Sequence, residues 1–187
     1  RFMNWSRGVG GGGAIDLAIH LNGMGFKDAV EWLWRRFSGP DLPGQALPPP
    51  ELNLKLPPPD EGSLWRVKRY LVADRHIAPA IIDLLIEAGR LYADNRANAV
   101  FLLLGKKNAP VGAELRGTGH SSWRGLAPGS RKDLGFFAIQ AADAEGIVLC
   151  ESAIDAVSCF AIHPRYRCIS TAGARPNPRW LAPLIRQ

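Results

Sequence analysis

Apolar residues at intervals of three and four predict two short helices near the N-terminus. The first covers 14–20 and follows the glycine run Gly10–Gly13, and the second covers 26–37. Together they predict a helical N-terminal unit over residues 1–37. The glycine run resembles a phosphate cradle at a helix N-terminus, but it lacks the Gly-Lys-Ser/Thr ending of a nucleotide-binding loop.

A second helical region is predicted further along the chain. Ser63 is a suitable N-cap for a helix that reaches Leu71, and Pro79 opens another helix that ends at Gly89. Because only a short segment separates them, these two helices predict a helical hairpin.

The pattern then changes to short apolar runs bounded by turn residues, which predict strands. Residues 99–104 and 111–116 are expected to pair across the turn Gly105–Asn108, and 135–139 forms another strand. A β-α-β series opens over 146–155 with a strand and a turn, and it continues through a helix that reaches 162 to a second strand at 168–170. A final helix is predicted over 179–186. The fold class predicted is α/β, or α+β overall.

Eight prolines between Ser38 and Asp60 exclude regular structure there and predict a semi-rigid linker over 38–62. The chain has 187 residues, of which 47% are hydrophobic, yet no apolar stretch approaches the roughly 20 residues of a membrane helix. We therefore expect a soluble, cytoplasmic protein with no membrane partner. The N-terminus carries no signal peptide and the chain does not begin with Met, which predicts a piece of a longer polypeptide.

Charge and cysteine usage narrow the class further. Lysine and arginine outnumber the acids by 23 to 17, for a formal charge of +6, which permits binding to phosphate polyanions. The cysteines Cys150, Cys159 and Cys168 have no histidine at ligand spacing, so neither a zinc knuckle nor a disulfide framework is predicted. We expect buried free thiols.

Glu151 stands at the carboxyl end of the predicted strand 146–150, where open α/β sheets place ligands and chemistry. The alternative is a Glu at a helix N-terminus, favoured only by the macrodipole. Asp155 follows one turn later and has two interpretations as well. It could share a divalent cation with Glu151, or it could be a first-turn acid.

The loop after the second strand of the series contains Thr171 and Gly173, whose hydroxyl and backbone N–H groups should lie near Glu151. Such a loop can hold phosphate or orient a catalytic acid. A small-residue turn that serves only strand-to-helix packing explains the same residues.

The segment between the hairpin and the β-α-β series is rich in Gly and Ser and contains Trp123. It also contains four cationic residues: Arg116, Arg124, Arg131 and Lys132. Cations interleaved with an aromatic side chain suit phosphate contacts and base stacking on single-stranded nucleic acid or a nucleotide. A solvated loop is the alternative.

These segments together resemble a known family. Residues 148–156 resemble the first motif of the Toprim domain, the catalytic module of bacterial primases and topoisomerases, and 169–173 match the segment that follows it. Upstream, three segments resemble the basic, strand-rich subdomain of primases: 98–101, 111–116 and 128–132. Residues 7–17 look like the end of the primase-type zinc-binding domain. The overall pattern is similar to Toprim-containing, primase-like proteins of plasmids and other mobile elements.

The resemblance implies four parts. Residues 1–37 would be a remnant of the zinc-binding domain without its ligands, and 38–62 the linker. Residues 63–139 would form the basic subdomain, and 140–187 the first half of a truncated Toprim domain.

The resemblance also implies roles. Glu151 would be the general acid or base of nucleotidyl transfer, and Arg116 and Lys132 would neutralise template or nucleotide phosphates. Mg²⁺ would be held by an Asp-x-Asp motif expected beyond Gln187, with Asp155 as a further ligand, and Zn²⁺ would belong upstream of this chain. The fragment alone is therefore predicted to be inactive.

The leading hypothesis is a primase-like protein that acts on single-stranded DNA and nucleoside triphosphates during replication or transfer of a mobile element. The alternative is a non-catalytic module that binds single-stranded DNA beside a relaxase or helicase domain. A third possibility is a small-molecule α/β enzyme with no affinity for DNA.

Overall fold

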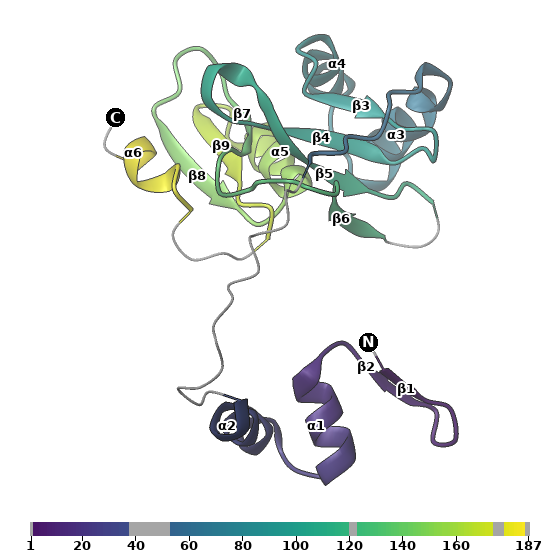
Figure 1. Ribbon diagram of the computed structural model, residues 1–187. Coiled ribbons are helices and arrows are strands. Elements are labelled where there is room, and N and C mark those ends of the chain that lie inside the picture. The colour runs from purple at the N-terminus through teal and green to yellow at the C-terminus, as the bar shows by residue number, and fades with distance from the viewer. Residues whose placement is uncertain (1, 38–52, 120–122, 174–177, 186–187) are drawn as a thin grey trace. The chain divides into compact units, whose positions relative to one another are not determined.

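The computed structural model describes residues 2–37, 53–119, 123–173 and 178–185. The chain divides into two compact units, Arg1–Pro50 and Glu51–Gln187 (Figure 1). Of the predicted linker over 38–62, residues 38–52 lie outside the described residues.

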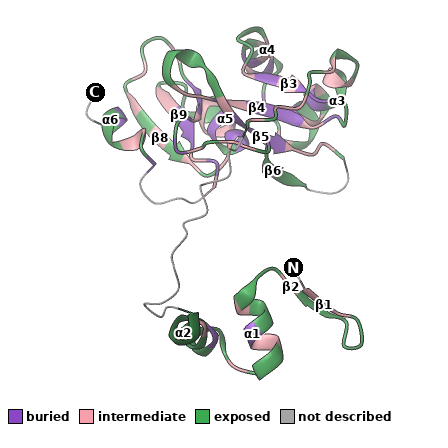
Figure 2. Cartoon of the chain, in the orientation of Figure 1, coloured by how far each residue is buried: buried purple, intermediate pink, exposed green. Residues whose placement is uncertain are grey.

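The N-terminal unit holds both predicted helices, α1 (Ala14–Asn22) and α2 (Phe26–Phe37). Helix α1 ends at Gly23, whose left-handed φ of 63° lets its N–H donate to the carbonyl of Ile19 at 2.9 Å. Among the described residues of this unit only Ala18 and Ala29 are buried apolar side chains (Figure 2).

A hairpin that the sequence did not predict precedes these helices, formed by β1 (Phe2–Asn4) and β2 (Val9–Gly11). Part of the glycine run therefore belongs to a strand. A Cβ at Gly11 would lie 2.4 Å from the Cβ of Asp16 and 2.6 Å from Cε1 of Phe2. Close packing thus explains the glycine at this position without a phosphate.

The second unit begins with helices α3 (Leu64–Arg69) and α4 (Pro79–Glu87). Pro79 opens α4 and Ser63 occupies the N-cap position of α3, both as predicted, but the backbone of Ser63 is already helical and its side chain makes no capping hydrogen bond. The reason is a 3₁₀ turn, Glu61–Ser63, that leads directly into α3. A π-helical turn, Tyr70–Asp74, extends α3 at its other end.

Four antiparallel strands form the first sheet of this unit, in the order β3-β4-β5-β6. The predicted hairpin is confirmed, since β4 (Ala99–Leu104) pairs with β5 (Pro110–Arg116). The edge strands β3 (Leu91–Ala93) and β6 (Arg124–Leu126) were not predicted. Arg124 consequently lies on a strand and not in the solvated loop of the alternative interpretation.

The second sheet has the order β7-β9-β8, with β8 (Gly146–Cys150) parallel to β9 (Tyr166–Ser170) and β7 (Phe137–Ile139) antiparallel to β9. Helix α5 (Ala153–Ile162) connects β8 to β9, which confirms the β-α-β series. Helix α6 (Leu181–Ile185) begins two residues after the predicted start at 179, and the predicted end at 186 lies outside the described residues.

The two sheets meet where Leu104 and Phe136 exchange backbone hydrogen bonds of 2.9 and 3.2 Å. Phe101 and Phe137, one from each sheet, pack edge to face with ring centroids 5.3 Å apart. One hydrophobic core contains both rings together with buried side chains of α3, α4 and α5. The parts expected over 63–139 and 140–187 therefore lie in one compact unit of mixed α/β fold.

Residues 53–60, from the predicted linker, run along this unit. The N–H of Lys55 donates to the carbonyl of Pro128 at 2.9 Å, and the hydroxyl of Tyr92 donates to the carbonyl of Pro57 at 2.8 Å. A Cβ at Gly129, whose φ is 78°, would lie 2.4 Å from the carbonyl oxygen of Asn53. A glycine is required here because the two segments approach so closely. Within the described ranges, no helix is long and apolar enough to cross a membrane.

Candidate functional site

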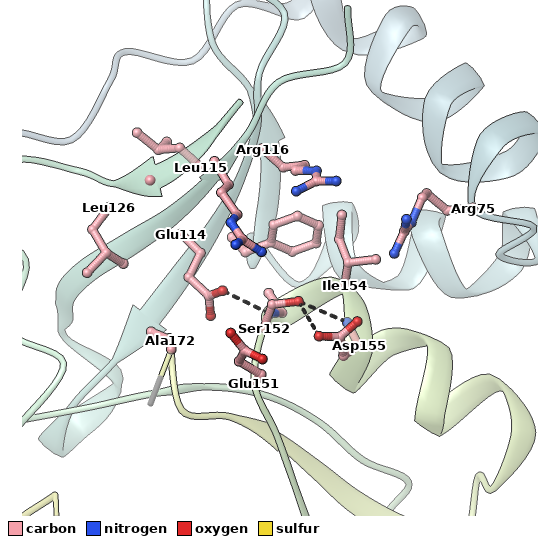
Figure 3. A pocket seen from close by; sticks show the side chains of 15 residues that line it. Arg75, Glu114, Leu115, Arg116, Leu126, Glu151, Ser152, Ile154, Asp155 and Ala172 are labelled. Carbon is pink, nitrogen blue, oxygen red and sulfur yellow. Dashed lines mark hydrogen bonds between the residues drawn. The ribbon is translucent and has the colours of Figure 1, made fainter. Parts of the chain in front are cut away.

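A cleft of about 370 Å³ lies between the β5–β6 edge of the first sheet and the N-terminal turn of α5 (Figure 3). It brings together residues far apart in the sequence. Its charged lining residues are three acids and three arginines: Glu114, Glu151, Asp155, Arg75, Arg116 and Arg124. Of the eight site residues predicted from sequence, five line this cleft, namely Glu151, Asp155, Arg116, Arg124 and Gly173.

Strand register explains the wall formed by β5 and β6. Glu114 and Arg116 on β5 are opposite Leu126 and Arg124 on β6, and side chains two apart on a strand share a face. The β4 partner of Glu114 is Phe101, which is buried in the core. The same sheet face therefore changes from apolar at its centre to charged at its β6 edge.

The opposite wall is the turn between β8 and α5, with Glu151 at the strand end as predicted. Ser152 caps the helix: its Oγ accepts from the N–H of Asp155 at 3.3 Å and donates to the Asp155 carboxylate at 2.8 Å. The observed partner of Asp155 is thus a capping serine, as the first-turn interpretation expects. No group of three or more His, Cys, Asp or Glu able to hold a metal occurs among the described residues.

The loop Thr171–Gly173 fixes the backbone on which Glu151 is carried. Thr171 donates to the carbonyl of Cys150 through its N–H at 2.9 Å and its hydroxyl at 3.1 Å. The N–H of Gly173 donates to the carbonyl of Glu151 at 2.8 Å, and that of Ala172 to Ser170 Oγ at 3.0 Å. These N–H groups are occupied, so the geometry favours a loop that orients the acid over one that holds phosphate.

Glu114 is the cleft residue that sequence reasoning missed. One carboxylate oxygen accepts from the N–H of Ala153 at 2.9 Å, and the other accepts from the hydroxyl of Ser170, which is fully buried. Burial raises the pKa of the Glu114 carboxyl, while the hydrogen bonds from Ser170 and Ala153 oppose that rise. The available signal was an acid on the core-facing side of a predicted strand.

Arg75 is a second residue that was missed. It follows the π-helical turn, where its N–H donates to the carbonyl of Tyr70 at 3.2 Å, and His76 beside it has a φ of 54°. Figure 3 shows its side chain directed toward the part of the cleft where Ile154 and Asp155 lie. The hydroxyl of Tyr70 also accepts from Nε of Arg116 at 3.1 Å. One irregular helix end therefore supplies one arginine and orients another.

The other predicted cations lie outside the lining of the cleft. Arg131 makes two hydrogen bonds of 2.9 and 2.8 Å to Asp133, which raise the pKa of the Arg131 guanidinium. Lys132 Nζ donates to the carbonyl of Ala172 at 3.0 Å, so it supports the loop beside Glu151. Thr171 is likewise absent from the lining. Their predicted roles in nucleic-acid binding remain predictions.

The three cysteines are free, with Cys168 buried and Cys150 and Cys159 half-buried. Burial raises the pKa of the Cys150 thiol to about 11 and that of Cys168 to about 12. The expected free thiols are therefore observed, although only one of them is fully buried.

Comparisons with known proteins place this cleft in context. Residues 69–142 match a family described as "Protein of unknown function (DUF3991)", and this segment includes Arg75, Glu114, Arg116 and Arg124 but ends before Glu151. The chain is 30% identical over 204 residues to a "65 kDa protein" of Zymomonas mobilis. The alignment covers 95% of this chain and 32% of that protein, so the chain spans about a third of its curated relative.

Among solved structures, the chain is similar to the zinc-binding and RNA polymerase domains of the Aquifex aeolicus primase. The TM-score is 0.42 at 15% identity, with 94% of this chain and 55% of that chain covered. A similarity of this size carries no conclusion about activity. The functional argument therefore depends on the cleft itself.

Proposed function

We propose that this chain is part of a nucleic-acid-processing protein with a primase-like site, in which the cleft binds phosphate groups of single-stranded DNA or a nucleoside triphosphate beside Glu151. One observation supports this most: a single cleft contains Glu151 from the end of β8 and Arg116 and Arg124 from the basic strands. Glu151 belongs to the Toprim-like sequence segment, and Arg116 belongs to a primase-like one.

Arg75, Arg116 and Arg124, called the arginine wall below, suit the binding of phosphate groups. Guanidinium groups donate two parallel hydrogen bonds to phosphate oxygens and keep their charge at any physiological pH. Arg75, Arg116 and Arg124 all reach the cleft, and none of them forms an ion pair with a described residue. A volume of about 370 Å³ is within the range of small-ligand sites, on the order of 300–1,000 Å³.

Glu151 suits proton transfer. Its residue is exposed, and its carboxylate has no hydrogen-bond or ion-pair partner among the residues that the structure describes. A carboxylate that is held only by its backbone can accept a proton from a hydroxyl or return one to a leaving oxygen. In the proposed reaction Glu151 accepts the proton of a 3′-hydroxyl, whose oxygen bonds to the α-phosphorus of the nucleoside triphosphate while the bond from that phosphorus to the pyrophosphate oxygen breaks and pyrophosphate leaves.

The family resemblance led us to expect Mg²⁺. The described residues of this chain do not by themselves form a site for this ion. Asp155 is hydrogen-bonded to Ser152 and Glu114 to Ala153 and Ser170, which leaves Glu151 as the acid of the cleft without such a partner. We therefore assign no step to a metal here. Any Asp-x-Asp motif that completes the site would lie in another part of the whole protein.

A second function is a non-catalytic module that binds single-stranded DNA. The same arginine wall favours it. It is also favoured because the Asp155 carboxylate accepts a hydrogen bond from Ser152, the cap of α5, as a purely structural acid would. The two functions differ in what Glu151 does. In the module, its carboxylate contributes nothing essential.

Binding tests the property that both functions share. The affinity of the chain for a fluorescent single-stranded oligonucleotide should fall steeply as the salt concentration rises. Arg116→Ala plus Arg124→Ala should lower this affinity by about tenfold or more, because each lost phosphate contact also loses the counterions that the contact would release from the DNA. The matched control is Lys106→Ala plus Lys107→Ala, which removes the same charge from an exposed turn outside the cleft. Equal losses in both double variants would contradict the assignment of the cleft.

Catalysis separates the two functions. The longer protein, given a single-stranded template, nucleoside triphosphates and Mg²⁺, should make primers, and Glu151→Gln should abolish synthesis while leaving DNA affinity unchanged. Primer synthesis that survives Glu151→Gln would contradict the proposed role of Glu151. A longer protein that binds DNA and makes no primer would support the binding module instead.

A further inference from the structure

We propose that Glu114 is the positioning residue of the cleft: its carboxylate, hydrogen-bonded through both oxygens, fixes the turn that carries Glu151 against the β5–β6 wall. The geometric part of this inference stands on contacts alone. It rests on the proposed function only in assuming that the position of Glu151 matters for activity.

The first contact acts on the segment after Glu151. A carboxylate oxygen of Glu114 accepts from the N–H of Ala153, the first residue of α5 and two positions beyond Glu151, at 2.9 Å. The free N–H groups of a helix N-terminus carry partial positive charge, so a carboxylate is well placed there. Figure 3 shows this bond reaching across the cleft from β5 to the helix.

The second contact acts on the segment that holds Glu151 from the other side. The hydroxyl of Ser170 donates to the second oxygen of Glu114 and accepts from the N–H of Ala172. The loop that begins there bonds the carbonyls of Cys150 and Glu151 through Thr171 and Gly173. Glu114 is thus linked to the Glu151 turn both through α5 and through this loop.

A carboxylate is suited to accept these two hydrogen bonds at once. Two donors approach Glu114 from different elements, and a carboxylate offers two acceptor oxygens, whereas a glutamine offers one acceptor and one donor. The charged groups around it are mixed, because Asp155 raises and Lys132 lowers the pKa of Glu114. An apolar side chain could join the two walls without burying a charge, so packing alone does not account for an acid here.

The position of Glu114 also determines where a ligand phosphate can bind. Helix N-termini commonly bind phosphate, but the N–H of Ala153 is already occupied by an internal carboxylate. A phosphate in this cleft is therefore directed to Arg75, Arg116 and Arg124.

Amide hydrogen exchange of the chain tests the contacts without any ligand. In Glu114→Ala, exchange at Ala153 should accelerate by about tenfold or more relative to Leu102 in the β4–β5 hairpin, the size expected for losing a hydrogen bond to a charged acceptor. Exchange at Gly173, whose N–H donates to the Glu151 carbonyl, should accelerate by more than twofold because the loop loses its link to Glu114. Glu114→Gln should keep Ala153 protected because its amide oxygen still accepts. The control Glu87→Gln removes an exposed acid outside the cleft and should change neither amide.

A pH profile separates positioning by a charged group from simple packing. In the wild type, the Ala153 amide proton shift should titrate with a midpoint above the usual pKa of Glu, since burial raises the pKa of Glu114. This titration should vanish in Glu114→Gln and persist in Glu87→Gln and in Glu151→Gln. The result also stands if Glu114→Ala fails to fold.

The outcomes distinguish this inference from the proposed function. Exchange at Ala153 and Gly173 in Glu114→Ala within twofold of the wild type, or an Ala153 titration that survives Glu114→Gln, would overturn the positioning role even if DNA binds. If the wild-type chain binds no single-stranded DNA, the proposed function fails, while the exchange and titration results still decide the role of Glu114.

Discussion

The two walls of the cleft are built from different interactions. The Glu151 wall is held by hydrogen bonds to its backbone: the cap of α5 spans Ser152 to Asp155, and the loop Thr171–Gly173 bonds the adjacent strand end. In the arginine wall, sheet register holds Arg116 and Arg124 beside the core residue Phe101, and Arg75 extends into the cleft from the end of the π-helical turn. Changes in the first wall should therefore alter geometry and stability together, whereas charge removal in the second should alter binding alone.

The largest effect should come from removing the support of the arginine wall. Phe101→Ala deletes a ring that is 1% exposed and packs against Phe137, so we expect a loss of about 3–5 kcal/mol in the free energy of unfolding. Urea denaturation measures it. Leu126→Ala, on the same sheet face but 37% exposed, is the matched control. A loss for Phe101→Ala no larger than for Leu126→Ala would break the comparison.

The residue that joins the two walls should give a pH-dependent effect. A raised folded-state pKa means that folded Glu114 binds protons more tightly than the unfolded chain, so its contribution is greatest below its ordinary pKa of 4.5 and is lost as pH rises through the folded-state pKa. Urea denaturation at several pH values should show the stability of the wild type falling relative to Glu114→Gln as pH rises through this window. A difference that stays constant or grows would contradict the raised pKa.

The cap of α5 tests the Glu151 wall. Ser152→Ala removes the hydroxyl that accepts from the N–H of Asp155, and the expected cost is about 0.5–2 kcal/mol in the free energy of unfolding. Ser158→Ala, in the middle of the same helix, serves as control. Equal effects of the two serine variants would show that the cap does not stabilise the Glu151 wall.

The smallest effect should be that of a single arginine. Arg75→Ala should leave stability within about 0.5 kcal/mol of the wild type and lower the salt slope of single-stranded DNA binding by about one. Arg69→Ala, which removes an exposed arginine of α3 outside the cleft, is the charge-matched control. Identical salt slopes in the two variants would show that Arg75 does not contact the phosphates of the bound DNA.

The same contrast explains what the sequence could predict. The strand, the turn with Glu151 and the helix are consecutive over 146–162, so an apolar run followed by an acid and by helical spacing predicted their order and the place of Glu151. The β4–β5 hairpin was predicted for the same reason, because its turn lies between two apolar runs.

The arginine wall was predicted only in part because its arrangement is non-local. Arg116 and Arg124 were named, but β6 is three residues long and its pairing with β5 has no local signal. Glu114 finds its partners 39 and 56 residues away, and Arg75 depends on a π-helical turn that propensities do not reveal. Arg131 and Lys132 resembled the cleft arginines in sequence, yet their partners are Asp133 and the Ala172 carbonyl.

The central claim is that the cleft is where single-stranded DNA binds, and amide chemical-shift mapping tests it most directly. On titration with a short single-stranded oligonucleotide, the largest shift changes should be at Gly125, Ser152 and Gly173, which line the cleft from both walls. They should disappear in Arg116→Ala plus Arg124→Ala. Large changes confined to α2 or to the β4–β5 turn, with these three amides unmoved, would contradict the account.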